Sequence, residues 1–470
     1  MTGCKVTHFF KQNARQFAEL MFFLYFCKHI HCFFLIKLSI IVPAMKMKYN
    51  SLPFCLLLLG SLVLASCKHD MFDPNAYQNL INYTAPIGNI DPAHTWNLTR
   101  SYSIQVQLNT QQPVDKVQIL SGNPNEREGV EILAEQSDTL GNQVIMFFYA
   151  PICQNDFYAA VVTTDGKYLM KAFNSSEQVV VIDDDAIMQS GSFKSPDYQT
   201  YTYCFEEEYP KPSDDWDYND LVLRIQKVPA QADNEVRLKV TIAAVGASKQ
   251  LAAAIRLVGY DWIDVAAVGI EEGRTFDGAY NQQRQFIKDA SLLLRGQNGE
   301  AVLNLFEDAH WAMSPRLKSD GGGVLRMFYN TLTNVDGSSS AQLRPKTLTY
   351  VIKLRNPRLL SNFTLETLDP FIIEDFNSGK WEVHLYEYKK DGVLHDYGDN
   401  ATATSNSMVW ALKIPSGTFR WPQEGIGMGY YREGVLTGAY MEYGHSFGQW
   451  VVNHKSSLDW FRYPSTGLVY

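Results

Sequence analysis

Short runs of alternating apolar and polar residues, separated by turn-forming residues, limit the fold of this chain more than any other feature. Residues 102–108 and 236–242 alternate in this way, which is the period of a half-buried strand. Residues 144–149 are continuously apolar, as a fully buried strand would be, and 348–354 form a further strand candidate. Amphipathic helices are scarce, and 283–294 is the best candidate. The pattern predicts an all-β protein with two β-sandwich-like domains.

Turn signals suggest how these strands are connected and divided. Asp165-Gly166 stands between two strand candidates and predicts a hairpin. Pro229-Ala230-Gln231-Ala232 is a linker-like stretch, so we expect a domain boundary after residue 228. The predicted N-terminal domain covers 96–228 and the C-terminal domain covers 229–470.

The residues ahead of these domains have the features of a targeting device. Residues 45–66 contain two lysines, an apolar stretch and small residues directly ahead of Cys67, in the order of a secretory signal. Leu64-Ala65-Ser66-Cys67 resembles the bacterial lipobox, in which the cysteine is lipidated and becomes the mature N-terminus. The alternative is an ordinary signal peptide with an incidental cysteine. Lipidation at Cys67 would tether the mature protein to a membrane by acyl chains and not by a spanning helix.

Two flanking segments complete the predicted N-terminal organisation. Residues 67–95 are rich in Pro, Asp and Asn and are expected to form a tether. Residues 1–44 contain an apolar stretch interrupted by lysines and histidines, and charges at mid-membrane are costly. Because Met45 and Met47 stand where a lipoprotein signal would begin, we expect 1–44 to be a mis-assigned upstream extension.

Charge and cysteine content narrow the classes of partner. The chain has a net charge of −9, but residues 67–470 hold 34 basic and 49 acidic residues, a net charge of −15. An acidic body argues against nucleic acid or an anionic membrane surface as ligand and suits cations or uncharged partners. Five of the seven cysteines lie within residues 1–67. Cys153 and Cys204 could pair in an oxidising envelope, although their spacing does not demand it.

Carboxylates crowd residues 206–220, directly ahead of an apolar strand candidate. Calcium takes six to eight oxygen ligands in flexible geometry, and closely spaced carboxylates with an amide carbonyl can supply them. The alternative is a solvated acidic turn. The candidate ligands of a structural calcium ion are Glu206, Glu207, Asp215, Asp217, Asn219 and Asp220.

The order of residues around Asp215 begins like an EF-hand loop but departs from it. Asp220 stands at the sixth position, where an EF-hand has glycine, and Gln226 stands at the twelfth, where it has glutamate. A strand would place Asp215, Asp217 and Asn219 on one face and the intervening aromatic residues on the other. We therefore expect a site at a strand edge, completed across a hairpin by the glutamates at 206 and 207.

No set of residues in the sequence indicates catalysis. Residues 444–448 match G-x-S-x-G, but the acid and histidine that should follow the serine come in the wrong order, and no alternating β/α pattern surrounds the motif. The histidines of the mature chain are scattered, and His384, on a predicted strand over 381–388, is expected at the surface or between domains. Aromatic residues such as Trp410, Phe419 and Trp421 could stack on sugars, although core packing explains them better.

Four stretches resemble the LruC-domain lipoproteins of Gram-negative bacteria, a family largely of unknown function. They are Ile90-Asp91-Pro92 with Thr95-Trp96, Phe205-Glu206-Glu207 with residues 215–222, Pro370-Phe371-Ile372 with Glu382-Val383-His384-Leu385, and a closing block from Trp410 to Gly425. The resemblance implies all-β domains and envelope attachment, and supports calcium, but it brings no catalytic residues. Glu207 replaces the usual Asp, and residues 386–390 replace an expected P-G-x-x-P-T run.

These observations together predict a non-catalytic lipoprotein of the outer membrane or cell envelope, exposed at the surface. Its expected partners are the membrane, through the lipid anchor, and a glycan or a surface protein, with no nucleic acid. One alternative is a glycan-acting hydrolase, which would need two carboxylates about 5–10 Å apart across a cleft. The other is a purely structural envelope component.

Overall fold

The computed structural model describes residues 90–137, 141–207, 215–276, 286–287, 289–314, 326–335, 339–376, 379–388, 392–395, 408–432 and 435–470. The predicted upstream extension 1–44, the signal peptide 45–66, Cys67 and most of the tether 67–95 lie outside these residues. All described residues belong to one compact unit, Gln78–Tyr470. Among them, no helix has both the length and the apolar character needed to cross a membrane.

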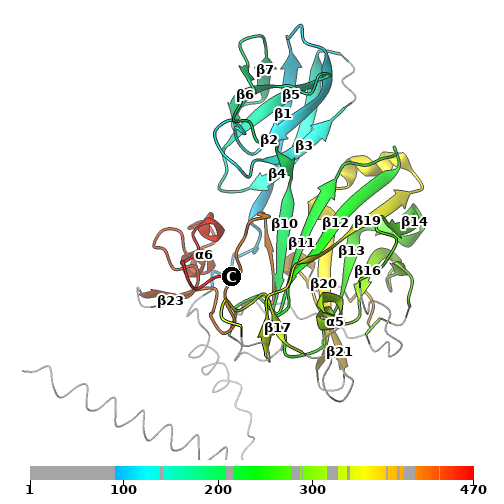
Figure 1. Cartoon of the computed structure of the whole chain (residues 1–470), viewed down its shortest axis with the longest axis vertical. Helices are drawn as coiled ribbons and strands as arrows, with labels where there is room; N and C mark the ends of the chain where they lie inside the picture. Colours follow the sequence, from blue (N-terminus) through cyan, green and yellow to red (C-terminus); the bar gives the residue numbers. More distant parts are fainter. Residues whose placement is uncertain are drawn as a thin grey trace, which may run out of the picture. The chain divides into compact units, whose positions relative to one another are not determined.

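The first group of strands forms two sheets (Figure 1). In the three-stranded sheet, β1 (Thr99–Leu108) lies between antiparallel β4 (Gln143–Pro151) and parallel β7 (Val179–Ile182). The six-stranded sheet has the order β8-β6-β5-β2-β3-β9. Its strands are β2 (Val114–Leu120), β3 (Glu131–Gln136), β5 (Asp156–Thr163), β6 (Tyr168–Asn174), β8 (Ile187–Met188) and β9 (Asp197–Tyr198).

Alternate residues of these two sheets form one apolar core. Val144, Met146 and Phe148 of β4 are buried with Phe157 and Val161 of β5, whereas the residues between them on β4 face outward. This is the arrangement of a β-sandwich, in which each strand contributes every second side chain to the interior.

The second group also contains two main sheets. The six-stranded sheet has the order β14-β19-β12-β11-β10-β22, and the five-stranded sheet has the order β15-β16-β13-β20-β21. The strands of the first are β10 (Thr200–Phe205), β11 (Leu221–Val228), β12 (Glu235–Ala244), β14 (Val265–Ile270), β19 (Lys346–Leu354) and β22 (Ala411–Ile414). Those of the second are β13 (Ala252–Asp261), β15 (Leu293–Arg295), β16 (Glu300–Phe306), β20 (Leu368–Phe376) and β21 (Gly379–Val383). Side chains of both sheets share one large core.

Small elements complete the described chain. They are the strand pairs β17 (Phe328–Tyr329) with β18 (Ser340–Ala341) and β23 (Tyr430–Arg432) with β24 (Val435–Thr437), the helices α5 (Ala309–Met313) and α6 (Phe447–Val452), and 3-10 turns at Trp262–Asp264, Pro357–Asn362, Leu365–Thr367, Tyr386–Tyr388 and Trp460–Arg462. The predicted all-β, sandwich-like fold class is thus confirmed.

Several sequence expectations need correction. The boundary expected after residue 228 falls in the turn between β11 and β12, which pair antiparallel in one sheet, so the sheets are not divided there. In the part of 283–294 that is described, residues 286–287 and 289–292 are not helical and β15 follows. The strand expected over 381–388 ends at Val383, and a 3-10 turn follows. The sequence left open whether Cys153 and Cys204 pair, and in the structure both are free thiols.

Candidate metal centre

The acidic segment ahead of β11 is an irregular turn and not the strand that its alternation predicted. β11 begins at Leu221, and both Trp216 (φ 55°) and Tyr218 (φ 54°) have left-handed backbone conformations. Such conformations cost non-glycine residues on the order of 1–3 kcal/mol each and persist only where surrounding structure holds them. Here two contacts hold the turn: Trp216 packs against Trp410 with ring centroids 4.6 Å apart, and the Tyr218 hydroxyl donates to the Val409 carbonyl over 2.6 Å.

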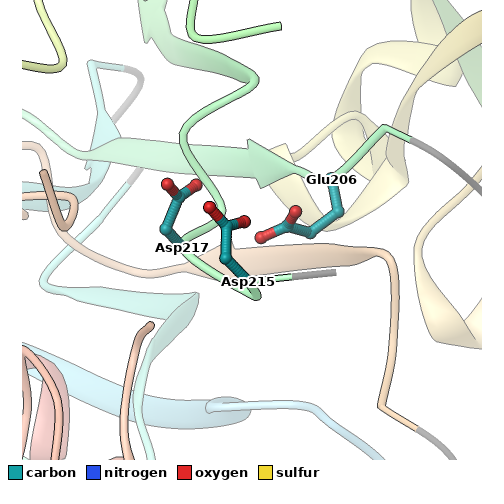
Figure 2. Close-up of side chains that lie close together, drawn as sticks. All are labelled: Glu206, Asp215 and Asp217. Carbon is teal, nitrogen blue, oxygen red and sulfur yellow. The ribbon is translucent and has the colours of Figure 1, made fainter. Parts of the chain in front are cut away.

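This turn brings together three of the predicted ligands. Each of Glu206, Asp215 and Asp217 offers one carboxylate oxygen, and these oxygens all lie within 4.8 Å of one another (Figure 2). Glu206 directly follows β10, and the antiparallel pairing of β10 with β11 sets Phe205 opposite Leu221. The hairpin therefore supplies one carboxylate from its first strand and two from the turn that leads into its second.

Backbone N–H groups orient two of these carboxylates. Glu206 accepts from the N–H of Tyr218. Asp217 accepts from the N–H of Asn219 over 3.1 Å and from that of Gly425 over 2.8 Å. The side chains of Glu206 and Asp217 are buried, whereas Asp215 is exposed. The group of three therefore has one member at the solvent, through which an ion could enter.

Burial and like charge act together on Asp217. Burial, with the negative charges of Asp215 and Glu424, raises the pKa of Asp217 well above its ordinary value, and the two N–H donors only partly oppose this. Carboxylates that crowd a buried site disfavour their own ionised forms. A bound cation would reverse this penalty, which makes the group a candidate metal centre.

Glu424 is a neighbour that the sequence analysis missed. Its negative charge helps to raise the pKa of Asp217. It also lies close to Gly246: if that glycine carried a Cβ atom, a Glu424 carboxylate oxygen would be only 2.9 Å from it. The Oδ1 atom of Asn219 would lie 1.9 Å from the same point, so only glycine fits there. Glu424 follows the predicted ligands by about two hundred positions, and no spacing rule connects them. Its membership in the closing Trp410–Gly425 block was the one available signal.

Asn219 is fully buried and its amide is half satisfied. Its Nδ2 group donates to the Pro422 carbonyl over 3.2 Å. Among the described residues, its Oδ1 atom has no hydrogen-bond partner. Buried polar atoms normally have hydrogen-bond partners, so this unsatisfied oxygen needs an explanation. Calcium binds side-chain amide oxygens together with carboxylates, which would account for it.

The structure does not bring Glu207 or Asp220 into the group of three. Glu207 accepts from the N–H of Ser248 and of Lys249, both over 2.9 Å, and from the Ser248 hydroxyl over 2.5 Å. Asp220 accepts from the N–H of Glu207. Glu207 thus ties the end of β10 to the loop after β12, and Asp220 ties it to the turn ahead of β11.

A second buried group of charges involves His384. The sequence indicated a position at the surface or between domains, whereas the side chain is fully buried. Its Nδ1 atom lies 2.8 Å from Asp369, its Nε2 atom lies 3.1 Å from Glu382, and Arg256 contacts Asp369 at 2.9 Å. Burial lowers the pKa of His384, but the charge of Asp369 and the hydrogen bonds to both acids outweigh this and raise it to about 9. Both ring nitrogens are thus engaged by buried carboxylates.

The G-x-S-x-G stretch forms a helix cap. Ser446 is buried and precedes α6, where its hydroxyl accepts from the N–H of Gln449 over 3.2 Å. His445 pairs with Asp459 at 2.8 Å and not with the serine. The predicted core positions of Trp410, Phe419 and Trp421 are confirmed, since all three are buried.

Comparison with known proteins places part of this chain in context. A family model described as a domain of unknown function (DUF4842) matches residues 234–461. A crystal structure of a putative lipoprotein from Bacteroides ovatus is 15% identical, with a TM-score of 0.43, and the similarity covers 76% of this chain and 99% of that chain. No curated protein matches the chain. The family match includes Glu424 and Gly425 but begins after the hairpin that carries Glu206, Asp215 and Asp217.

Proposed function

We propose that this chain is a lipid-anchored protein of the bacterial envelope, similar to the LruC-domain lipoproteins, that binds a surface glycan or protein and folds around a structural calcium ion. The anchor is Cys67, and the location is the outer membrane with the body exposed at the surface. The role is non-catalytic. The observation that carries the calcium proposal is the convergence of Glu206, Asp215 and Asp217 on one point.

The donor atoms favour calcium over other metals. All three side chains offer carboxylate oxygens, and Asn219 adds an amide oxygen that no described group satisfies. Hard oxygen donors without histidine or thiolate suit calcium or magnesium, and the irregular turn suits the flexible geometry of calcium better than the strict octahedron of magnesium. Residues Glu206, Asp215, Asp217 and Asn219 would hold the ion, which would neutralise their charge and supply no redox chemistry.

The contacts of two candidate ligands with the segment after β22 support a structural role for the ion. Asp217 contacts the N–H of Gly425, and Asn219 contacts the carbonyl of Pro422, so the site joins the β10–β11 hairpin to the segment after β22. An ion bound there would tie two distant segments together.

Thermal melting tests the calcium proposal on the full mature protein in detergent. A ligand that binds only the folded state raises the melting temperature. We expect calcium to raise it by several degrees relative to EDTA, magnesium to raise it less, and Asp217→Ala to remove the response. Glu128→Ala, which changes an exposed acid outside the site, is the matched control. Identical melting of the wild type in calcium and in EDTA would refute the site.

Terbium luminescence provides a direct reading of occupancy. Trp216 lies between two of the ligands in the chain, so its excitation should sensitise a terbium ion bound in place of calcium. We expect a signal that calcium displaces and that Asp215→Asn abolishes. The anchor is tested separately: labelling of cells with a fatty-acid analogue should mark the wild type and leave Cys67→Ala unlabelled.

A further inference from the structure

The outer face of the three-stranded sheet carries a row of exposed apolar side chains. Ile145 and Phe147 of β4 are 60% and 75% exposed, and Val179 of β7 is 44% exposed. Gln105 of β1 is opposite both Ile145 and Val179, so the row runs across the sheet. Large apolar side chains gathered on one face indicate an interaction surface more often than scattered ones do.

β4 is also an edge strand with an open backbone. Among the described strands it pairs with β1 alone. The N–H of Leu108 donates to the Asn142 carbonyl over 2.8 Å, so the backbone groups of even-numbered residues of β4 point toward β1. In an antiparallel pair the intervening residues point the other way. The backbone groups of Gln143, Ile145 and Phe147 therefore face away from the sheet.

One contact marks where this open edge ends. The Tyr149 carbonyl, also at an odd position, accepts from the Gln199 side chain over 3.0 Å. This confirms the outward direction of the odd-numbered backbone groups. It also occupies the edge at Tyr149. Among the described residues, no backbone hydrogen bond is made to the outer edge of the stretch centred on Ile145.

The available stretch lacks the features that protect edge strands. Natural proteins block such edges with lysine, proline, β-bulges or short length. Residues 143–150 contain no charged residue and no proline, and the β1–β4 register is continuous. The other edge strands of the described chain have such features: β7, β8, β9, β15 and β22 have only two to four residues, β14 pairs through a bulge, and β21 carries Lys380.

We propose that β4 pairs antiparallel with β4 of a second copy of this chain. A two-fold axis through Ile145 would set Ile145 opposite its own counterpart and Gln143 opposite Phe147 of the other copy. This register uses every outward backbone group between 143 and 147. A strand without charge meets itself without repulsion, and the two three-stranded sheets become one of six strands. The proposal is independent of the metal centre.

The oligomeric state of the full mature protein in density-matched detergent tests this pairing. Sedimentation equilibrium should show a reversible monomer–dimer equilibrium in the micromolar range. Ile145→Lys would place two charges together on the axis and should weaken the dimer at least tenfold. Ile263→Lys, at a site 63% exposed on a 3-10 turn, is the matched control and should leave the dimer unchanged. Thermal melting of each variant checks that the fold is retained.

Cross-linking tests the register itself. Directly opposed residues that exchange hydrogen bonds in an antiparallel pair have Cα atoms about 5.5 Å apart, which a disulfide can bridge. Ile145→Cys should therefore form a covalent dimer on mild oxidation, whereas Ile263→Cys should not. A wild type that stays monomeric at 100 μM would overturn the proposal. So would a dimer that Ile145→Lys does not weaken, because its interface would lie elsewhere.

Discussion

Two buried aspartates, Asp217 and Asp369, solve the same electrostatic problem in different ways. Both side chains are almost inaccessible to solvent. Asp369 contacts Arg256 at 2.9 Å and His384 at 2.8 Å, so the protein provides the balancing positive charge itself. Asp217 receives two backbone N–H groups, while Asp215 and Glu424 add further negative charge nearby.

The difference lies in where the balancing positive charge comes from. Burying an ion pair is tolerated when geometry and hydrogen bonds compensate for the lost hydration, and removing one partner then leaves the other charge exposed to a low dielectric. The Asp369 group contains its own positive charges, Arg256 and the protonated His384. The Asp217 group gathers three carboxylates whose oxygens lie within 4.8 Å of one another, and under the calcium proposal a bound cation would balance their charge.

The largest expected effect comes from breaking the self-contained group. Asp369→Ala leaves Arg256 and His384 buried without their shared acid, and we expect a loss of about 3–5 kcal/mol of unfolding free energy. Urea unfolding at pH 7, with and without calcium, measures it. The loss should be the same in both buffers. A loss below about 1 kcal/mol would mean that the buried group contributes little to stability.

Raising the pH should weaken the same group without a mutation. The folded-state pKa of His384 is raised from 6.5 to about 9, so the folded protein holds this proton more tightly than the unfolded chain does. The resulting stabilisation is complete below pH 6.5 and is lost as pH rises through about 9, on the order of 3 kcal/mol in total. Urea unfolding at pH 6, 7.5 and 9.5 measures it, and His384→Asn should flatten the dependence.

Calcium should change the stability of the protein through the Asp217 group and not through the Asp369 group. At a calcium concentration a hundred times the dissociation constant, the wild type should gain about 2.7 kcal/mol. Asp215→Asn should gain nothing from calcium, yet in EDTA it should be at least as stable as the wild type, because one of the crowded charges is gone. Unfolding of both proteins in the two buffers measures this. A variant less stable than the wild type in EDTA would argue that Asp215 is a structural partner and not a ligand.

The smallest effect is expected at Glu207. This variant tests whether an acid next to Glu206 belongs to the metal centre. Glu207→Gln removes the charge of a carboxylate that accepts hydrogen bonds from the N–H groups of Ser248 and Lys249. It should lower the free energy of unfolding by about 1 kcal/mol, because glutamine retains part of this bonding. Its response to calcium should equal that of the wild type. If calcium no longer stabilised this variant, Glu207 would belong to the ligand set after all.

The sequence predicted the regular parts of this fold well. Alternation at 236–242 and the apolar run at 144–149 correspond to β12 and β4, and Asp165-Gly166 forms the turn between β5 and β6. These features depend on side-chain period and on a glycine with φ 80° at position 166. Both are local properties, so a single sequence is enough to reveal them.

Errors arose where distant groups decide the local structure. At 283–294, where a helix was expected, the N–H groups of Phe286 and Ile287 donate to the Glu307 carboxylate instead of to helix carbonyls. The linker-like residues after Val228 form a hairpin turn because β11 and β12 are neighbours. His384 is interior because Asp369 and Glu382 neutralise it. Glu307 lies 20 or 21 positions from the N–H groups that donate to it, and Asp369 lies 15 positions from His384, so no local pattern reveals these two partners.

The candidate site was predicted in part for the same reason. The crowding of Glu206, Asp215 and Asp217 is visible in the sequence because the three lie within twelve positions. The left-handed turn at Trp216 and Tyr218 is not visible, since aromatic residues seldom adopt it and only their packing explains it. The approach of Glu424 depends on the complete fold.

The hydrogen bond from Gly425 to Asp217 spans 208 residues of chain. Contacts of such long range form late, because closing a large loop is slow compared with forming a local hairpin. A chain still being synthesised or exported presents the acidic turn without this donor, and the complete pocket exists only once the C-terminal segment has docked. Under the proposed calcium binding, the site would therefore be complete only after the C-terminal segment has folded against the acidic turn.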